Sequence, residues 1–340
     1  MAQAKKPTIN DVARLAGLSK KTVSRVMNDE GFVSEETRRR VRQIATEIGY
    51  QPDRRARALA ARRSFIIGLA FDNANASYVL DLLQGALSAA NARGYEIITH
   101  PAGAAGATAT DVADFIARSG IDGVILSPPM SEFRDIAAAL QSWGCPVVRI
   151  AGDDAAIDAH QVRFDDRSAA VEMTAHLIGL GHTRIGFVGG TEDLGPSRRR
   201  LAGHLDALSA RGLALAAEHT AWGDFTFASG VQCGHRLLSL PQRPTAIFCC
   251  NDEMAAGVIH AARELGLDVP GDVSVTGFDD APIALQLWPT LTTVKQPVRE
   301  MGATAASRLI DQIEAAQPRP AVDELRHSLV LRESTAPPAP

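Results

Sequence analysis

A basic, hydroxyl-rich stretch near the N-terminus carries the side chains best suited to contact nucleic acid. Val23, Val26 and Met27 recur there at helical spacing, which predicts a short helix with one buried face. The polar residues around them are left outside, where they can donate hydrogen bonds to phosphates and base edges. These polar residues are Ser19, Lys20, Lys21, Thr22, Ser24 and Arg25.

A second short helix is predicted immediately before this one. Thr8 can cap it, with Asp11 three residues on as a variant of the capping box. Gly17 supplies a tight turn, and Ser19 caps the basic helix that follows. Two helices of this kind form the helix-turn-helix pattern of DNA-binding proteins. The alternative is a small helical subdomain with a solvated basic face.

The charge distribution favours the DNA-binding interpretation. Residues 1–63 hold 15 Lys and Arg against 7 Asp and Glu, a net charge of +8. The whole chain of 340 residues has a net charge of −4, so the remainder carries −12. A basic head on an acidic body is what contact with a phosphate backbone requires.

These features resemble the LacI/GalR family of bacterial transcription repressors over nearly the whole chain. The resemblance implies that the second helix lies in the DNA major groove, with Lys20, Lys21 and Arg25 reading bases. It implies roles in backbone contact or helix positioning for Thr8, Ser19, Thr22, Ser24 and Asn28. A third helix, capped by Ser34, is expected from there to about Gly49.

The segment 51–63 follows the expected head, residues 1–50. It contains five arginines around Leu59, and Pro52 and Asp53 follow its first residue, Gln51. The resemblance implies a hinge helix in the minor groove, where Leu59 wedges a base step and Ala56 is the small groove-facing residue. The alternative is a solvated linker.

Beyond residue 64 short apolar runs alternate with amphipathic segments. This alternation predicts an α/β fold with parallel sheets covered by helices. The expected strands are 65–71, 95–100, 123–127, 146–150, 161–164, 184–189, 246–250 and 273–278, and the expected helices include 79–93, 168–180, 197–211 and 252–265. The resemblance implies a two-lobed, periplasmic-binding-protein-like core over 64–334, in which the chain crosses between the lobes near 157–164 and 291–297, and again before the C-terminus. The Pro- and Ala-rich tail 335–340 is expected to be disordered.

Ligands of open α/β sheets bind beyond the carboxyl ends of the strands. That rule selects Ser127, Phe164, Asn251 with Asp252, and Asp279 with Asp280. The resemblance adds Arg200 as an effector-binding arginine, with Asp279 and Asn251 as partners of ligand hydroxyls. It also implies aromatic platforms at Phe164 and Phe225, and a first-lobe contribution from Asp72, Tyr78 and Ser127. The alternatives are a surface role for Arg200, a helix cap for Asp279, core packing for the two phenylalanines and a turn for Ser127.

Two departures from the family pattern bear on this site. Ala151 occupies the position after residues 146–150 where the family often has Asp. The sequence from Ala76 to Val79 replaces a common Asn-Pro-Phe-Phe. The effector of any one relative therefore cannot be transferred to this chain.

Other functional classes find little support in the sequence. The sequence contains no phosphate loop, no G-x-S-x-G and no H-E-x-x-H, so neither an enzyme nor a bound cofactor is expected. The four cysteines lack metal-ligand spacing, so we expect buried thiols and no metal. Without a signal peptide or a long apolar run, the protein is expected to be cytoplasmic and not bound to a membrane.

The sequence as a whole predicts a homodimeric, sugar-responsive transcription regulator that binds a near-palindromic operator in double-stranded DNA. A repressor of carbohydrate-use genes, released from DNA by its effector, fits best. The main alternative is a regulator that needs a purine or another small metabolite as corepressor. A sugar hydrolase or kinase and a transport binding protein are disfavoured by the basic helical head.

Overall fold

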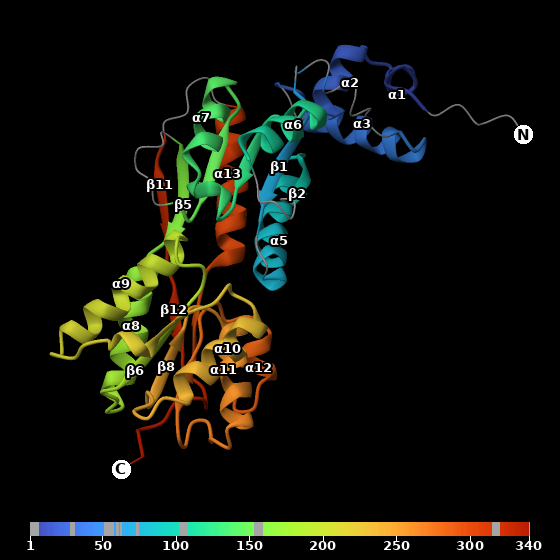
Figure 1. Ribbon diagram of the computed structural model, residues 1–340. Coiled ribbons are helices and arrows are strands. Elements are labelled where there is room, and N and C mark those ends of the chain that lie inside the picture. Colours follow the sequence, from blue (N-terminus) through green and yellow to red (C-terminus); the bar gives the residue numbers. More distant parts are fainter. Residues whose placement is uncertain are drawn as a thin grey trace, which may run out of the picture. The chain divides into compact units, whose positions relative to one another are not determined.

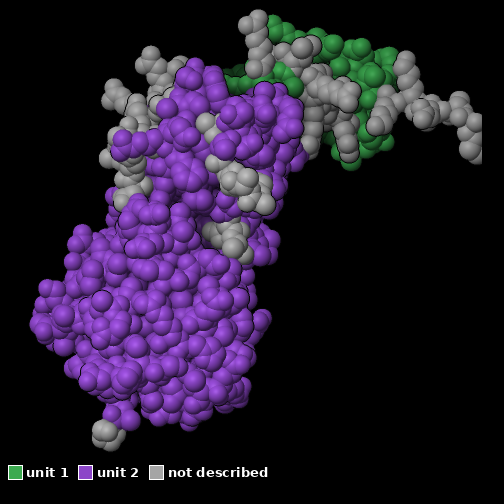
Figure 2. Space-filling model, viewed as in Figure 1, with its two compact units in different colours: residues 1–65 green, residues 66–340 purple. Residues whose placement is uncertain are grey.

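Figure 1 shows the computed structural model, which describes residues 7–27, 31–50, 58, 61, 63–72, 75–101, 108–152, 159–314 and 320–339. The chain divides into two compact units, residues 1–65 and 66–340 (Figure 2). Each unit has its own hydrophobic core.

The first unit is a three-helix head. Its helices are α1 (Ile9–Ala16), α2 (Lys20–Met27) and α3 (Glu35–Glu47). Gly17, with a φ of 64°, forms the turn between α1 and α2. The helices enclose a small core to which each contributes, made of Val12, Ala13, Ala16, Val23, Val26, Val41 and Ala45. The head is all-α, as the sequence predicted.

Hydroxyl and carboxylate groups define the helix starts in the head. The backbone N–H of Thr8 donates to Asp11 Oδ2 at 2.9 Å, and the Ser19 hydroxyl accepts from the backbone N–H of Thr22 at 3.1 Å. Ser34 caps α3 by accepting from the backbone N–H of Thr37 at 3.3 Å. All three predicted caps are present.

The second unit contains two lobes. The sheet of the first lobe has the order β11-β5-β4-β3-β1-β2, and all of its pairs are parallel. Its strands are β1 (Ile66–Phe71), β2 (Glu96–Pro101), β3 (Gly123–Leu126), β4 (Val147–Ile150), β5 (His160–Phe164) and β11 (Val322–Leu325). The helices of this lobe are α5 (Ala76–Ala92), α6 (Ala109–Ser119), α7 (Arg134–Ser142), α13 (Val298–Glu314) and the 3-10 turn η1 (Met130–Glu132).

The second lobe is built around a smaller parallel sheet of order β7-β6-β8-β9. Its strands are β6 (Ile185–Gly189), β7 (Thr220–Trp222), β8 (Ala246–Cys249) and β9 (Ser274–Thr276). Its helices are α8 (Asp166–Gly179), α9 (Gly195–Ser209), α10 (Phe227–Leu238), α11 (Asp252–Glu264), α12 (Ile283–Gln286) and the 3-10 turn η2 (Ala217–His219). β10 (Thr293–Lys295) and β12 (Ser328–Val330) pair antiparallel as a separate ribbon.

The chain passes between the two lobes three times. It leaves the first sheet after β5 and enters α8, returns from β10 into α13, and leaves again between β11 and β12. On its return α13 packs along α5 and against β3, β4 and β5 (Figure 1). The two-lobed α/β architecture and the three crossings agree with the sequence prediction.

The C-terminal tail corrects the prediction. Residues 335–340 were expected to be disordered, but the described part, 335–339, continues a segment held against β9. The backbone N–H of Val275 donates to Ser334 O at 2.9 Å, and the backbone N–H of Ala336 donates to the hydroxyl of Ser274 at 3.0 Å. β9 is an edge strand, and its polar groups need partners that the tail supplies.

The part of the chain that the structure describes contains no helix long and apolar enough to cross a membrane. The expected hinge segment, 51–63, lies mostly outside the described residues.

Candidate functional site

The exposed face of α2 presents the residues expected to read DNA. Lys20, Lys21 and Arg25 are exposed on it, while Val23 and Val26 are fully buried beneath. This arrangement leaves long cationic side chains on one face of a helix anchored by its apolar side.

Of the other residues expected to contact DNA, Thr8 and Ser19 sit at the starts of α1 and α2. Thr22 and Ser24 are half-buried on α2, and the hydroxyls of Ser19 and Thr22 lie 2.9 Å apart. Asn28, Ala56 and Leu59 lie outside the described residues, so their expected roles stay predictions.

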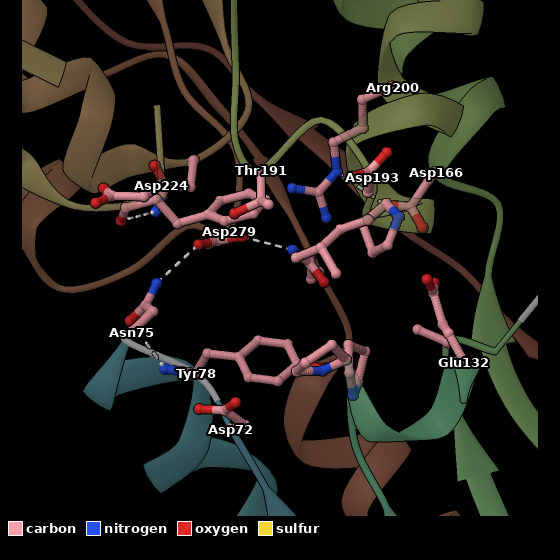
Figure 3. A pocket seen from close by; sticks show the side chains of 18 of the residues that line it. Asp72, Asn75, Tyr78, Glu132, Asp166, Thr191, Asp193, Arg200, Asp224 and Asp279 are labelled. Atoms are coloured by element: carbon pink, nitrogen blue, oxygen red, sulfur yellow. Dashed lines mark hydrogen bonds and ion pairs between the residues drawn. The ribbon is translucent and has the colours of Figure 1, made fainter. Parts of the chain in front are cut away.

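A cavity of about 490 Å³ lies between the two lobes of the second unit (Figure 3). Side chains from both lobes line it, and most of the effector-binding residues expected from sequence are among them. Those are Asp72, Tyr78, Phe164, Arg200, Phe225, Asn251 and Asp279. Ser127 does not line the cavity: it is fully buried, and its hydroxyl has no hydrogen-bond partner among the described residues.

Arg200 lies in the second turn of α9, with its guanidinium held from three directions. Nε donates to Asp166 Oδ1 at 2.8 Å, Nη1 donates to the backbone oxygen of Cys250, and the guanidinium carbon lies 3.7 Å from the centre of the Phe278 ring. Burial opposes the charge on Arg200, but the carboxylates of Asp166 and Asp279 outweigh it and raise its pKa. Arg200 is therefore part of a buried polar network rather than the solvated helix surface.

Asp166, at the start of α8, is clamped by two arginines. Besides Arg200, it accepts from Nη2 of Arg199 at 3.2 Å, and the same Nη2 donates to the backbone oxygen of Ala151 at 3.1 Å. Ala151 is the position where the family often has Asp, so here the backbone rather than a carboxylate meets the arginine.

Glu132 connects the two lobes. It ends η1 in the first lobe, and its Oε2 accepts from the backbone N–H of Gly195, the first residue of α9 in the second lobe, at 2.9 Å. Its Oε1 lies 4.0 Å from Nη1 of Arg199. A carboxylate at the start of a helix is also stabilised by the helix dipole.

Asp279 occupies an unusual backbone conformation, with a φ of 125°. Its side chain accepts from Nδ2 of Asn75 at 3.0 Å and from Nε2 of Gln296, so residues of the first lobe and of a crossing segment both hold it (Figure 3). Burial raises the pKa of Asp279 to about 7, against the opposing effect of Arg200. Asp279 does not cap a helix through these contacts, so the helix-cap alternative is not what its side chain does.

Asn251 is the N-cap of α11, and its amide also reaches the cavity wall. Oδ1 accepts from the backbone N–H of Met254 at 2.9 Å, and Nδ2 donates to the backbone oxygen of Phe225 at 2.9 Å. Phe225 has a φ of 67° and its ring covers Gly190. The strained loop around Phe225 is thus tied to the start of α11.

Asp252, next in the chain, positions the loop that carries Asp279. Its carboxylate accepts from the backbone N–H of Ala281 at 2.7 Å and from the hydroxyl of Thr293 at 2.6 Å. Burial raises the pKa of Asp252 well above its usual value, and the neighbouring Asp279 adds to the rise.

Aromatic surfaces line the cavity as well. Phe164 is buried and its ring packs at 6.1 Å from that of Phe278. Tyr78, in the first turn of α5, points into the cavity from the first lobe (Figure 3), and burial raises the pKa of its phenol.

Several residues of this network were missed at the level of sequence, namely Asn75, Glu132, Asp166, Arg199 and Gln296. Asp166 could have been found, since it follows β5 by two residues and so lies at a strand end. Nothing in sequence spacing places Glu132 or Gln296 here, because the first enters through the short turn η1 and the second through a crossing segment. Within the described ranges no group of His, Cys, Asp and Glu side chains is arranged to hold a metal ion.

Comparisons with known proteins cover both units. A family model described as bacterial regulatory proteins, lacI family, matches residues 8–53, and one described as a periplasmic binding protein-like domain matches residues 174–335. The HTH-type transcriptional repressor PurR of Pectobacterium atrosepticum is 33% identical over 339 residues, which is 97% of each chain.

Two solved structures extend the likeness to three dimensions. The structure of the lac repressor dimer bound to operator and the anti-inducer ONPF is 30% identical, with a TM-score of 0.80, and the match covers 98% of this chain and 100% of that one. A complex of the transcriptional regulator CelR with cellobiose is 29% identical, with a TM-score of 0.73, over 96% of this chain and 99% of that one.

Proposed function

Because the chain belongs to the LacI family of bacterial DNA-binding transcriptional regulators, we propose that it is a dimeric repressor released from its operator by a sugar. One observation carries the proposal. Arg200 and Asp279, far apart in the sequence, line the same cavity of about 490 Å³ together with aromatic rings from both lobes.

The chemistry of this cavity suits a sugar. Carboxylates and guanidinium groups form charge-assisted hydrogen bonds with hydroxyls, and flat rings such as those of Phe164 and Phe225 can pack on the C–H faces of a pyranose. The volume falls within the range of about 300–1,000 Å³ that small-molecule sites occupy. The cellobiose complex of CelR supports the same class of effector.

The head supplies the DNA-binding half of the proposed mechanism. α2 enters the major groove with Lys20, Lys21 and Arg25 toward the bases, and segment 51–63 acts as a hinge in which Ala56 and Leu59 meet the minor groove. A sugar that binds one arrangement of the lobes more tightly than the other shifts the population between DNA-binding and released forms. Residues 1–50, 51–63 and 64–334 are the head, hinge and core of this proposal, which acts in the cytoplasm and involves no catalysis.

The likeness to PurR supports a second candidate function, in which the ligand has the opposite effect on DNA binding. In that case the molecule bound in the cavity is a corepressor, and the ligand-bound form is the one that binds DNA. The sign of the ligand's effect on DNA binding separates the two.

The test is an operator-binding titration with the full-length dimer and a panel of sugars. Wild type should release DNA as the effective sugar is added. Arg200→Ala and Asp279→Ala should raise the sugar concentration needed by about ten- to a hundredfold, since each removes a charged hydrogen-bonding partner worth about 1.5–3 kcal/mol.

The matched control is Arg211→Ala, because Arg211 is exposed beyond the end of α9 and does not line the cavity. It should release DNA at the wild-type sugar concentration. If both cavity variants do so as well, the proposed site is wrong. DNA binding that requires ligand would favour the corepressor candidate.

A further inference from the structure

The cavity between the lobes has a strong excess of negative charge. Six carboxylates line it, but Arg200 is the one basic side chain among its lining residues within the part of the chain described. The carboxylates come from both lobes and lie on several sides of the space (Figure 3). They belong to Asp72, Glu132, Asp166, Asp193, Asp224 and Asp279.

Asp166 already balances positive charge of the nearby arginines within the protein. Arg200 and Arg199 both bind Asp166, and their remaining contacts include the backbone oxygens of Cys250 and Ala151. Asp166 is therefore neutralised. Four of the other five carboxylates form no ion pair with any described residue. These are Asp72, Asp193, Asp224 and Asp279.

Side chains already take up some of the backbone N–H groups at the helix starts that line the cavity. Asn75 caps α5 by accepting from the backbone N–H groups of Ser77 and Tyr78. Glu132 takes the backbone N–H at the start of α9, and Asn251 takes one at the start of α11. A helix N-terminus is a ready site for phosphate or carboxylate only when its N–H groups are free.

We propose that the cavity selects a positively charged sugar, an amino sugar, over its neutral parent and excludes the corresponding acid or phosphate. This inference rests on the proposed function, since it specifies the charge of the effector. The sugar hydroxyls bind Arg200 and the amides, and the ammonium group is attracted by the carboxylates of Asp72, Asp193 and Asp224, which form no ion pair. Asp72, Asp193 and Asp224 are exposed, so their attraction for a cation acts partly through water. The walls of the cleft strengthen it by concentrating the field.

The experiment compares sugars that differ in one group. Binding of glucosamine, glucose, glucuronate and glucose 6-phosphate to the full-length protein is measured by calorimetry at neutral pH and low salt, and the matching galactose set is measured in parallel. In the set of the preferred stereochemistry, the amino sugar should bind at least about tenfold more tightly than the neutral sugar. The acid and the phosphate should bind more weakly than both. Raising the ionic strength should narrow the difference.

Two variants test whether the cavity carboxylates cause the preference for an amino sugar. Asp193→Asn and Asp224→Asn each remove one negative charge and keep the shape of the side chain, so each should narrow the affinity ratio of amino to neutral sugar by about threefold or more. Glu218→Gln makes the same change in charge at an exposed residue outside the cavity lining. It should leave that ratio unchanged.

The outcomes separate this inference from the proposed function. A neutral or acidic sugar that binds as tightly as the amino sugar overturns the inference and leaves the sugar-responsive repressor intact. If no member of either set binds, both fail. An affinity ratio that Glu218→Gln narrows as much as the cavity variants do also overturns the inference, because the preference would then come from net charge alone.

Discussion

The carboxyl group of Asp279 is buried, which disfavours its charged form. The stability of the core therefore depends on pH. Burial raises its pKa from 3.8 to about 7 in the folded protein. Between these values the folded state keeps a proton that the unfolded state has lost, so the free energy of unfolding falls as pH rises through this window. Above about pH 7 the contribution of Asp279 is fully lost.

We expect the stability of Asp279→Asn relative to wild type to be about 1–3 kcal/mol higher at pH 8 than at pH 4. The reason is that the amide carries no charge to bury. Urea unfolding at both pH values measures this. Asp135→Asn, at an exposed residue of α7, is the control and should show no such gain. Equal differences at the two pH values would show that Asp279 does not titrate in this range.

Position 190 must be a glycine because the ring of Phe225 covers it. A Cβ at this position would lie 2.1 Å from the Phe225 ring, so Gly190→Ala must displace that ring. We expect a loss of about 1–3 kcal/mol of stability and weaker sugar binding, measured by urea unfolding and calorimetry. Gly179→Ala has open space around its Cβ and serves as the control. Unchanged sugar affinity in Gly190→Ala would remove Phe225 from the binding surface.

The strand-end rule identifies Asn251 and Asp279, but it also selects Ser127, which does not line the cavity, and it fails for residues that arrive by other routes. Asn251 and Asp279 follow buried apolar runs, which is a local pattern. Asn75 and Gln296 become neighbours of Asp279 only once the lobes and crossing segments are assembled. No local pattern of residues encodes such contacts.

At the scale of elements, α5 and α13 meet through glycines. A Cβ on Gly85 would lie 1.9 Å from the backbone oxygen of Arg299, and one on Gly302 would lie 2.1 Å from that of Leu82. The two helices thus approach backbone to backbone, and α13 can pack closely only because both positions lack a side chain.

Gly85→Ala should force these helices apart and destabilise the first lobe by about 1–3 kcal/mol or more, since a backbone atom cannot rotate away as a side chain can. Thermal or urea unfolding measures the loss. Ser88→Ala, at an exposed position of the same helix, is the control and should stay within about 0.5 kcal/mol of wild type. A Gly85→Ala protein as stable as the control would contradict the close approach.

The same scale shows which elements the sequence can predict. Fully buried strands such as β3, β4 and β8 were predicted to within a residue at each end, because continuous apolar runs mark them. β11 was not predicted, since its residues are mostly exposed or half-buried and give no apolar run. The tail was mistaken for a disordered segment because its Pro and Ala composition does not reveal that β9 lacks partners.

At the scale of the whole molecule, residues 1–63 carry a net charge of +8 and the rest of the chain carries −12. Operator affinity should therefore fall steeply with salt, by roughly a thousandfold between 50 and 200 mM if about six phosphates are contacted. Fluorescence anisotropy across this range measures the slope. A flat dependence would contradict a clamp made by two basic heads.

Lys21→Ala should reduce the preference for operator over random duplex by about 1–3 kcal/mol, because an exposed lysine of α2 that reads a base edge is lost. Competition binding with the two duplexes measures it. Arg211→Ala removes a positive charge from the core instead and should keep the wild-type preference. Equal losses with both duplexes would make Lys21 a phosphate contact.

The three passages of the chain between the lobes also govern the order in which the protein can fold on the ribosome. The core of the head is formed by residues between Val12 and Ala45, so the head can fold as soon as this segment leaves the ribosome. The first lobe cannot, because its sheet needs β11 and its helical layer needs α13, and both follow the sheet strands of the second lobe along the chain. The second lobe waits for β12 and the tail that covers β9. The nascent chain therefore presents a folded DNA-binding head well before the two lobes that form the ligand cavity are complete.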